Sequence, residues 1–349
     1  MPIPTTCIGA YPKPDYVPIS DWFQVSHDTE DYDKQVTQTW SDEVMQSHIA
    51  LFDKATAEVI SDQIACGIDL PTDGEVRREN YVHYQCRHFA GFDFENLTER
   101  SMRNDAYTTS LPTIRGKVLA EDNQTLVRDW QVAQAAADRP VKITLPGPMT
   151  ISDTTADAFY GDAAALARDL ADALNMQVRA LAEAGCKHIQ VDEPIFARKP
   201  KEALDYGMET LERCFQSVPS DVVRVAHMCC GYPCALDDVD YPKADQHSYV
   251  EIAKSVDGLV DEISIEDAHR YNPSHLFELF ERSRLIVGFV TIASSRVEPV
   301  EEIRTRMQAV LDHMDHDRLI AAPDCGLGFL GRDLAIQKLT NLCEAARSL

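Results

Sequence analysis

The sequence predicts one (β/α)8 TIM barrel that occupies residues 1–349, and three observations support this fold class. The length of 349 residues suits one large α/β barrel. Short apolar runs rich in valine and isoleucine recur, mostly separated by amphipathic helical patterns, which is typical of a parallel sheet covered by helices. Eight such runs favour a closed barrel over a doubly wound open sheet, and no internal repeat or flexible linker divides the chain.

The elements follow one another largely in strand–helix order. Strands are expected at 5–9, 70–76, 141–147, 188–194, 222–229, 262–268, 284–292 and 318–325. Helices are expected at about 41–66, 163–184, 201–217, 274–282, 300–314 and 332–347. Two segments break the alternation. Residues 86–123 predict an inserted β-hairpin or lid after the second strand, and residues 230–250 predict a long polar loop after the fifth.

The charge balance restricts the partners of the protein. With 57 acidic and 33 basic residues the net charge is −24, so the chain should repel nucleic acid and anionic lipid. No apolar run reaches the length of about 18 residues that a membrane helix needs, and the first residues do not resemble a signal peptide. The ten cysteines are therefore expected to stay reduced in a cytoplasmic setting, where cysteine near histidine indicates a metal site or catalysis.

Chemically capable side chains gather where the expected strands end. In a (β/α)8 barrel the active site forms at the carboxyl ends of the strands. Acidic, histidine or cysteine residues lie at five of these ends: Asp73, Glu75, Asp192, Glu193, His227, Cys229, Glu266, Asp267, Asp324 and Cys325. Solvation of buried strands does not readily explain this set, so we expect the ends to form one functional mouth.

The segment 226–234, AHMCCGYPC, carries the first candidate metal ligands. Residues i and i+2 of a strand point to the same side, so His227 and Cys229 can face one ion. By the same alternation Cys230 should point away from it, and Cys234 belongs to the loop. The motif alone is weak, and its place at the end of a strand strengthens it.

Two further ligands are expected from later strands. Cys325 follows the eighth strand and Glu266 the sixth, so both can converge on the same mouth. A histidine, two thiolates and a carboxylate suit Zn²⁺ better than Mg²⁺ or Ca²⁺. Such an electron-rich zinc is suited to holding a substrate thiol as thiolate, with Glu266 yielding as the sulfur arrives, which indicates S-alkyl transfer. The alternative is that Cys229 and Cys325 are core thiols and His227 is a satisfied buried histidine.

Glu75 and Asp192 are the expected substrate-binding acids. They project from the second and fourth strands and can hold a cationic group, such as the amino group of an amino-acid thiol, by charge-assisted hydrogen bonds. Together with Glu266 they form the expected catalytic set. The alternative is that both acids cap helices or pair with arginines, for which the candidates are Arg77, Arg78 and Arg198.

Six motifs occur along the chain in a specific order: IGAYPKP, TDGEVR, QVDEP, AHMCCG, SIED and APDCGLG. Together they resemble the C-terminal catalytic barrel of cobalamin-independent methionine synthase, and the likeness runs from about residue 5 to 345. The family's long N-terminal half has no counterpart here, so the chain resembles a short, single-barrel member. The resemblance implies a cytoplasmic enzyme of methionine biosynthesis. It also implies zinc ligands and homocysteine-binding acids at His227, Cys229, Glu266 and Cys325, and at Glu75 and Asp192.

Other positions depart from the family's pattern. Ala10 stands where the family has a serine near the homocysteine carboxylate, and Thr154 stands where a tryptophan stacks on the pterin. Thr291 and Ala293 replace the D-I-H-S residues near the methyl donor. The resemblance therefore implies a methyl donor other than a folate bound in the family's usual way. The insert and the long loop are expected to shape the donor pocket, with three candidate lining residues: Tyr81, Tyr107 and Tyr232.

Three functions remain open. The first is methylation of homocysteine from a non-folate donor, such as a methyl-corrinoid protein or a methylated small molecule. The second is alkyl transfer to another thiol such as coenzyme M, as in the related epoxyalkane:coenzyme M transferases. Its sulfonate would need cations, and the candidates are Arg77, Arg78, Arg270 and Arg296. The third is a non-catalytic zinc- or thiol-binding protein. Retained Glu75 and Asp192 favour homocysteine, whereas Ala10 weakens that assignment.

Overall fold

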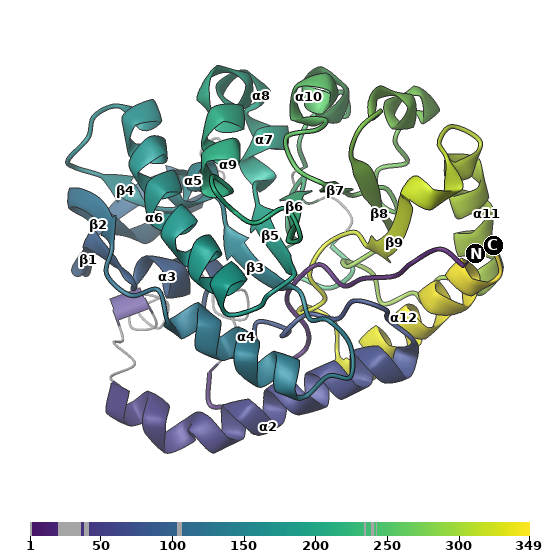
Figure 1. Ribbon diagram of the computed structural model, residues 1–349, viewed down its shortest axis with the longest axis horizontal. Coiled ribbons are helices and arrows are strands. Elements are labelled where there is room, and N and C mark those ends of the chain that lie inside the picture. The colour runs from purple at the N-terminus through teal and green to yellow at the C-terminus, as the bar shows by residue number, and fades with distance from the viewer. Residues whose placement is uncertain are drawn as a thin grey trace.

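A parallel sheet of six strands lies at the centre of the protein (Figure 1). The computed structural model describes residues 2–19, 36–37, 42–102, 107–233, 235–238, 241 and 243–349. The sheet has the order β3-β5-β6-β7-β8-β9. Its strands are β3 (Ile143–Pro146), β5 (His188–Asp192), β6 (Val223–Met228), β7 (Glu262–Ile265), β8 (Arg284–Val290) and β9 (Leu319–Pro323). All six lie within strand positions that the sequence predicts.

Isolated bridges close this sheet into a barrel. They are parallel, and they join Thr5 to Ala321, Thr6 to Leu70 and Thr72 to Lys142. The first two expected strands thus occupy their places in the barrel without forming regular ladders. Pro71 has no N–H to donate, and the Gln63 side chain bonds both the N–H and the carbonyl of Thr72 at 2.9 and 3.0 Å. The barrel predicted from the sequence is confirmed, with its closure resting on single residue pairs.

Helices surround the barrel (Figure 1). The longer ones are α2 (Asp42–Cys66), α4 (Thr125–Ala135), α6 (Ala163–Glu183), α10 (Ser248–Val256), α11 (Val300–Leu311) and α12 (Arg332–Arg347). In α6, Asp162 caps the first turn by accepting from the N–H groups of Ala164 and Ala165. Leucines then recur on its buried face, each stabilising the packed state by roughly 1.5–3 kcal/mol. Among the described residues, no helix is long and apolar enough to cross a membrane.

Two expected helices are wrong in form. The segment 201–217 is broken into α8 (Pro200–Glu202), the π-helical turn η2 (Ala203–Gly207) and α9 (Met208–Cys214), after a short α7 (Pro194–Arg198). The segment 274–282 forms only the 3₁₀ helix η3 (Ser274–Leu279). Here the Asp257 carboxylate accepts from the backbone N–H groups of residues 281–283 and ends the helical path. Tertiary hydrogen bonds therefore override the apolar spacing.

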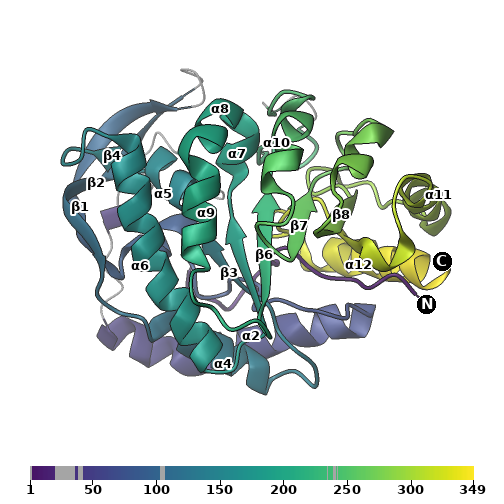
Figure 2. The ribbon, with the colours of Figure 1, turned by 45° about the horizontal axis from the view of Figure 1, so that its top comes forward.

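The insert after the second strand position is a hairpin, as the sequence predicts. Strands β1 (Phe89–Met102) and β2 (Tyr107–Ala120) pair antiparallel, and β2 adds the short parallel strand β4 (Ala156–Asp157). The hairpin lies at one edge of the molecule beside α6 (Figure 2). The helix α3 (Tyr81–Cys86) precedes it, and α5 (Pro148–Asp153) follows β3.

The two ends of the chain meet on the outside of the barrel. The backbone N–H of Ile3 donates to the carbonyl of Ala346 at 3.2 Å, and the termini lie side by side in both views (Figures 1 and 2). The loop after β6 folds back on its own strand, where the N–H of Ala244 donates to the carbonyl of Cys230 at 2.8 Å. This return brings the predicted polar loop over the mouth of the barrel.

Candidate metal centre and substrate pocket

The register of three adjacent strands places two parts of the candidate site side by side. Asp192 ends β5 and pairs with His227 on β6, which pairs in turn with Ser264 on β7. All three are buried. Because the carboxyl ends of parallel strands share one edge, an acid expected to bind substrate adjoins an imidazole expected to bind metal.

His227, Cys229 and Cys325 form a cluster of donors. Each offers one ligand atom, and the three atoms lie within 4.8 Å of one another. The Nδ1 atom of His227 pairs with the Ser264 hydroxyl at 2.9 Å, while its Nε2 atom is buried with no hydrogen-bond partner. Burial lowers the pKa of His227 to about 3, so the ring is in the neutral form that binds metals. An orphaned ring nitrogen beside two thiols fits Zn²⁺.

The thiol of Cys229 disfavours ionisation of the Cys325 thiol. A hydrogen bond with Cys229, followed by burial, raises the pKa of Cys325 well above its ordinary value. A cation between them would reverse this effect, because coordination deprotonates a thiol. Cys230 is fully buried in the main hydrophobic core rather than in the cluster, as strand alternation predicts. Cys234 lies outside the described residues.

Glu266 borders the cluster and is held by partners of its own. Its Oε1 atom accepts from the Cys230 N–H at 2.9 Å and from the Cys229 thiol at 3.0 Å. Its Oε2 atom accepts from the Lys243 ammonium at 2.6 Å. Although burial alone would raise it, the pKa of Glu266 is lowered by Lys243 and these hydrogen bonds. The carboxylate is therefore anionic and touches the donor cluster through Cys229.

Glu75 occupies a constrained turn at the end of the second strand position. Its φ of 56° lies in the left-handed region, which a residue with a side chain adopts at a cost of about 1–3 kcal/mol. A Cβ on Gly9 would come within 2.5 Å of its Oε1 atom, so a glycine is needed there. The carboxylate accepts from the Thr144 hydroxyl at 2.8 Å and lies 3.6 Å from Arg78. The alternative expectation of an arginine partner is thus met for Glu75, and the acid still lies at the mouth.

Asp192 is buried at the end of β5, near enough to the buried amine of Lys142 to interact with it electrostatically. It accepts from the Gln190 amide at 2.7 Å. Burial and repulsion from Glu75 raise its pKa well above the ordinary value, while Gln190, Lys142 and Arg78 act in the opposite direction. The Lys142 ammonium is fully buried without a hydrogen-bond partner, and burial lowers its pKa to about 8. The two substrate-side acids therefore share one site, and each favours a positive charge between them.

Tyr81 lies close to both parts of the mouth. Its pKa is raised well above the ordinary value by burial, and then by Asp192, Cys229, Cys325 and Glu75. The Tyr81 phenol thus lies within electrostatic range of both thiols and both carboxylates, which supports its expected place as a lining residue.

The expected lining residue Tyr232 and the expected substrate-binding position Ala10 both meet the loop after β9. Tyr232 donates its hydroxyl to the carbonyl of Gly326 at 3.2 Å. Ala10 touches the same loop, since it accepts from the Leu327 N–H at 2.7 Å. The side chain of Tyr107 is outside the described ones.

Four acids beside these candidates serve the fold. Glu193 accepts from the N–H groups of Met149 and Thr150 and caps α5. Asp324 accepts from three successive N–H groups of residues 267–269. The remaining two pair with arginines: Asp73 with Arg78 and Asp267 with Arg306. At four of the five strand ends, one residue belongs to the candidate site while a nearby acid is held by partners within the protein.

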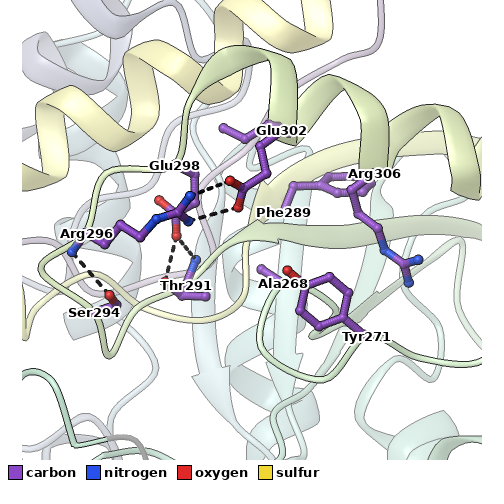
Figure 3. A pocket seen from close by; sticks show the side chains of 10 residues that line it. Ala268, Tyr271, Phe289, Thr291, Ser294, Arg296, Glu298, Glu302 and Arg306 are labelled. Carbon is purple, nitrogen blue, oxygen red and sulfur yellow. Dashed lines mark hydrogen bonds and ion pairs between the residues drawn. The ribbon is translucent and has the colours of Figure 1, made fainter.

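The positions that depart from the family's pattern are occupied by small residues with local partners. Thr154 donates to the Thr150 carbonyl at 2.8 Å, and Thr291 donates to Glu298 at 2.6 Å. A cavity of about 140 Å³ opens beside Thr291 and the exposed Tyr271. Figure 3 shows Arg296 paired with Glu302, and Glu298 hydrogen-bonded to Thr291. The polar groups of this cavity are thus largely used within the protein.

Sequence reasoning missed the residues that support the candidate ligands. Ser264 orients the His227 ring, Thr144 orients Glu75, and Lys243 holds Glu266. Strand alternation could have found Ser264, because it lies in β7 two residues before Glu266. Thr144 reaches Glu75 from a different strand, β3, so no local signal marks it. No local signal marks Lys243, which reaches the site only because the loop folds back.

The whole chain matches known proteins. Residues 3–348 match the family model described as cobalamin-independent synthase, catalytic domain. A methionine synthase from Sulfurisphaera tokodaii is 30% identical over 99% of this chain and 92% of its own length. One from Sulfolobus acidocaldarius is 29% identical over 98% of this chain and 91% of its own.

Solved structures agree with these matches. A B12-independent methionine synthase from Shewanella sp. W3-18-1, in complex with selenomethionine, has a TM-score of 0.84 at 27% identity and covers 99% of this chain and 97% of that one. A putative vitamin-B12-independent methionine synthase from Listeria monocytogenes shares the fold, with a TM-score of 0.70 at 17% identity, over 99% of this chain and 98% of that one.

Proposed function

The chain belongs to the cobalamin-independent methionine synthase family of methyltransferases, and from this premise we propose that it is a zinc-dependent enzyme that methylates homocysteine to methionine. The observation that carries the proposal is the buried, unpartnered Nε2 atom of His227 beside the thiols of Cys229 and Cys325. Without an ion, this arrangement leaves a polar atom unsatisfied in the interior, which costs about 1–3 kcal/mol.

The proposed metal ligands are His227, Cys229, Cys325 and Glu266. Zinc bound there would keep a substrate thiol deprotonated at neutral pH. The chain's own residues prepare for this: the Ser264 hydroxyl pairs with Nδ1 of His227 and orients the ring, which leaves Nε2 available to a metal ion. The four donors come from β6 and the segments that follow β6, β7 and β9, so their relative placement depends on a rigid barrel.

Glu75 and Asp192 are proposed to bind the amino group of homocysteine. Burial and the nearby Glu75 raise the pKa of Asp192, and an ammonium between the two carboxylates would offset this repulsion. The complex of the Shewanella relative with selenomethionine supports an amino-acid ligand, since this compound is methionine with selenium in place of sulfur. With the amino group fixed, the sulfur would attack the donor's methyl carbon in line. The S–C bond forms as the bond from the donor to methyl breaks, and the donor leaves with the electron pair.

Coenzyme M is the less favoured thiol because the candidate cations are engaged. Arg77 pairs with Asp129, Arg78 with Thr144 and two acids, and Arg296 with Glu302. Arg270 donates to the carbonyls of Ala244 and Asp245. A sulfonate would have to displace these partners, whereas an ammonium meets acids that already face the mouth.

The methyl donor is proposed to be a non-folate compound or a methyl-carrying corrinoid protein. Thr154 and Thr291 offer hydroxyls bonded within the protein where the family's donor-facing residues stand. A threonine has no aromatic face on which a pterin could stack.

X-ray absorption at the zinc edge tests this proposal on the zinc-loaded protein. Homocysteine is expected to add one sulfur to the metal's ligands, and coenzyme M is expected not to do so. If neither thiol enters, the alkyltransferase proposal fails; if coenzyme M alone enters, the methionine proposal fails. Growth of a methionine auxotroph that lacks both known types of synthase then tests the reaction in cells, and failure to grow with soluble protein present would contradict it.

A further inference from the structure

Lys243 forms a buried ion pair with one of the proposed metal ligands. Its Nζ atom lies 2.6 Å from Oε2 of Glu266, and the two side chains are 14% and 1% exposed. This short contact joins an ammonium directly to a carboxylate oxygen, so the two side chains form an ion pair inside the mouth.

The position of Lys243 is fixed by the backbone around it. The next residue, Ala244, donates to the Cys230 carbonyl at 2.8 Å and accepts from Arg270 at 2.9 Å. The ammonium also lies 4.9 Å from the centre of the Tyr241 ring. The loop is thus bound to the end of the strand that carries Cys229, and Lys243 cannot leave without breaking these contacts.

Fold stability does not explain such a pair well. Taking two charges out of water costs several kcal/mol per ion, so buried ion pairs are weak contributors to stability. Removing one partner, by contrast, leaves an unpaired buried charge, which is strongly unfavourable. A buried pair beside a reactive centre therefore indicates that the anion needs a partner at some point in the reaction.

The charges at the proposed metal site indicate when Glu266 would need a cationic partner. Two thiolates and one carboxylate exceed the charge of Zn²⁺ by one, and the Lys243 cation balances that excess. If a substrate thiolate replaces Glu266 at the metal, the released carboxylate becomes a further buried anion. In the structure Oε2 of Glu266 accepts from Lys243, while Oε1 accepts from the Cys230 N–H and from the Cys229 thiol, so one oxygen is held by the lysine and the other borders the donor cluster.

We propose that Lys243 is a positioning residue that holds the Glu266 carboxylate when the substrate sulfur takes its place at the metal. The inference rests on the proposed function and deepens it: Lys243 makes Glu266 an exchangeable ligand and thereby favours thiol entry. It acts through Glu266 and does not touch the substrate.

The test compares Lys243→Met with Lys243→Arg and with the control Lys187→Met. Lys187 forms an exposed ion pair with Asp221 at the opposite end of the barrel. We expect every variant to retain wild-type zinc content. Lys243→Met should weaken homocysteine binding about tenfold or more, and should reduce the added zinc–sulfur signal at a fixed homocysteine concentration. Lys243→Arg should restore most of the binding, and Lys187→Met should behave as the wild type.

Three results would overturn the inference or its premise, and they are distinguishable. If Lys243→Met binds homocysteine as tightly as the wild type does, the inference is wrong and the proposed function stands. If Lys243→Met loses zinc while folded, Lys243 serves metal binding itself and the inference is again wrong. If the wild-type protein takes up no sulfur, the proposed function fails. Lys243→Gln makes the same comparison if the methionine variant is unstable.

Discussion

The two halves of the barrel mouth differ in how far the protein itself satisfies their polar groups. In the proposed metal half, comprising His227, Cys229, Cys325 and Glu266, one buried nitrogen has no partner and the pKa of the Cys325 thiol is raised beside Cys229. In the proposed carboxylate half, comprising Glu75 and Asp192, each acid accepts a hydrogen bond from a neighbouring side chain. On the proposed function, an ion would complete the metal half, whereas the protein itself largely supports the carboxylate half. Substitutions in the first should change metal retention, and those in the second should change substrate affinity alone.

The largest effect is expected from Cys325→Ser. Removing one donor should weaken zinc binding by at least about 100-fold, the upper range for the outer partners of metal ligands, and activity should fall with it. Competition with a chromophoric chelator measures the affinity. The neighbouring Cys230→Ser is the control, because that thiol lies in the core rather than in the donor cluster. Equal zinc affinity of the two variants would remove Cys325 from the ligand set.

A smaller effect is expected from Asp192→Asn in the carboxylate half. Losing one charge-assisted hydrogen bond of about 1.5–3 kcal/mol should raise the KM for homocysteine by about 10- to 100-fold. Zinc content should stay at the wild-type value. Glu193→Gln is the adjacent control, since Glu193 caps α5. If Asp192→Asn lost zinc, the carboxylate half would also contribute to metal binding, and the proposed division of roles between the two halves would be wrong.

The pH dependence of stability should come partly from the acids that fix loops. Burial raises the pKa of Glu193 from 4.5 to about 8. The folded protein therefore holds a proton that the unfolded chain has lost, and stability falls as pH rises from about 4.5 to 8. The contribution should be about 2 kcal/mol between pH 5.5 and 7.5. Urea unfolding at these two pH values measures it, and an equal pH dependence in Glu193→Gln would contradict the assignment.

The smallest effect is expected from Tyr81→Phe, which joins the comparison because Tyr81 lies near both halves. Removing one neutral hydroxyl should lower kcat/KM by about 2- to 10-fold, in line with 0.5–1.5 kcal/mol for a hydrogen bond. Steady-state kinetics with homocysteine as the varied substrate measure this, beside zinc analysis. An increase in kcat/KM would show that the phenol obstructs the pocket.

The sequence predicts the metal half better than the carboxylate half for a physical reason. The spacing of His227 and Cys229 exploits the two-residue period of a strand, which the sequence displays directly. The partners of Glu75 depend instead on the turn at φ 56° and on Thr144 from another strand. The role of Lys243 is harder still to predict from the sequence, because tertiary hydrogen bonds bring its loop back to the barrel.

At the level of the fold, the eight strand positions are predicted, two expected helices are wrong in form, and α4 and α10 are not expected from the sequence. Apolar spacing predicts which residues are buried. In segments 201–217 and 274–282 this burial pattern is present, but the backbone does not form one regular α-helix. The Asp257 carboxylate ends the second of these by binding three backbone N–H groups. The sequence also does not predict that single bridges close the barrel. At Thr72 the Gln63 side chain takes the hydrogen bonds that a neighbouring strand would otherwise make.

That closure has a consequence for the order of folding. The bridge between Thr5 and Ala321 joins the two extremes of the chain, so during synthesis the emerging N-terminal segment must wait for its last partner. Contacts of such long sequence separation form late and slowly. Cys325 follows directly after β9, and Ala10 bonds the loop beyond it. In the nascent protein, His227 and Cys229 therefore lack Cys325 until the final strand joins the barrel, and the same event closes the sheet and assembles the donor cluster.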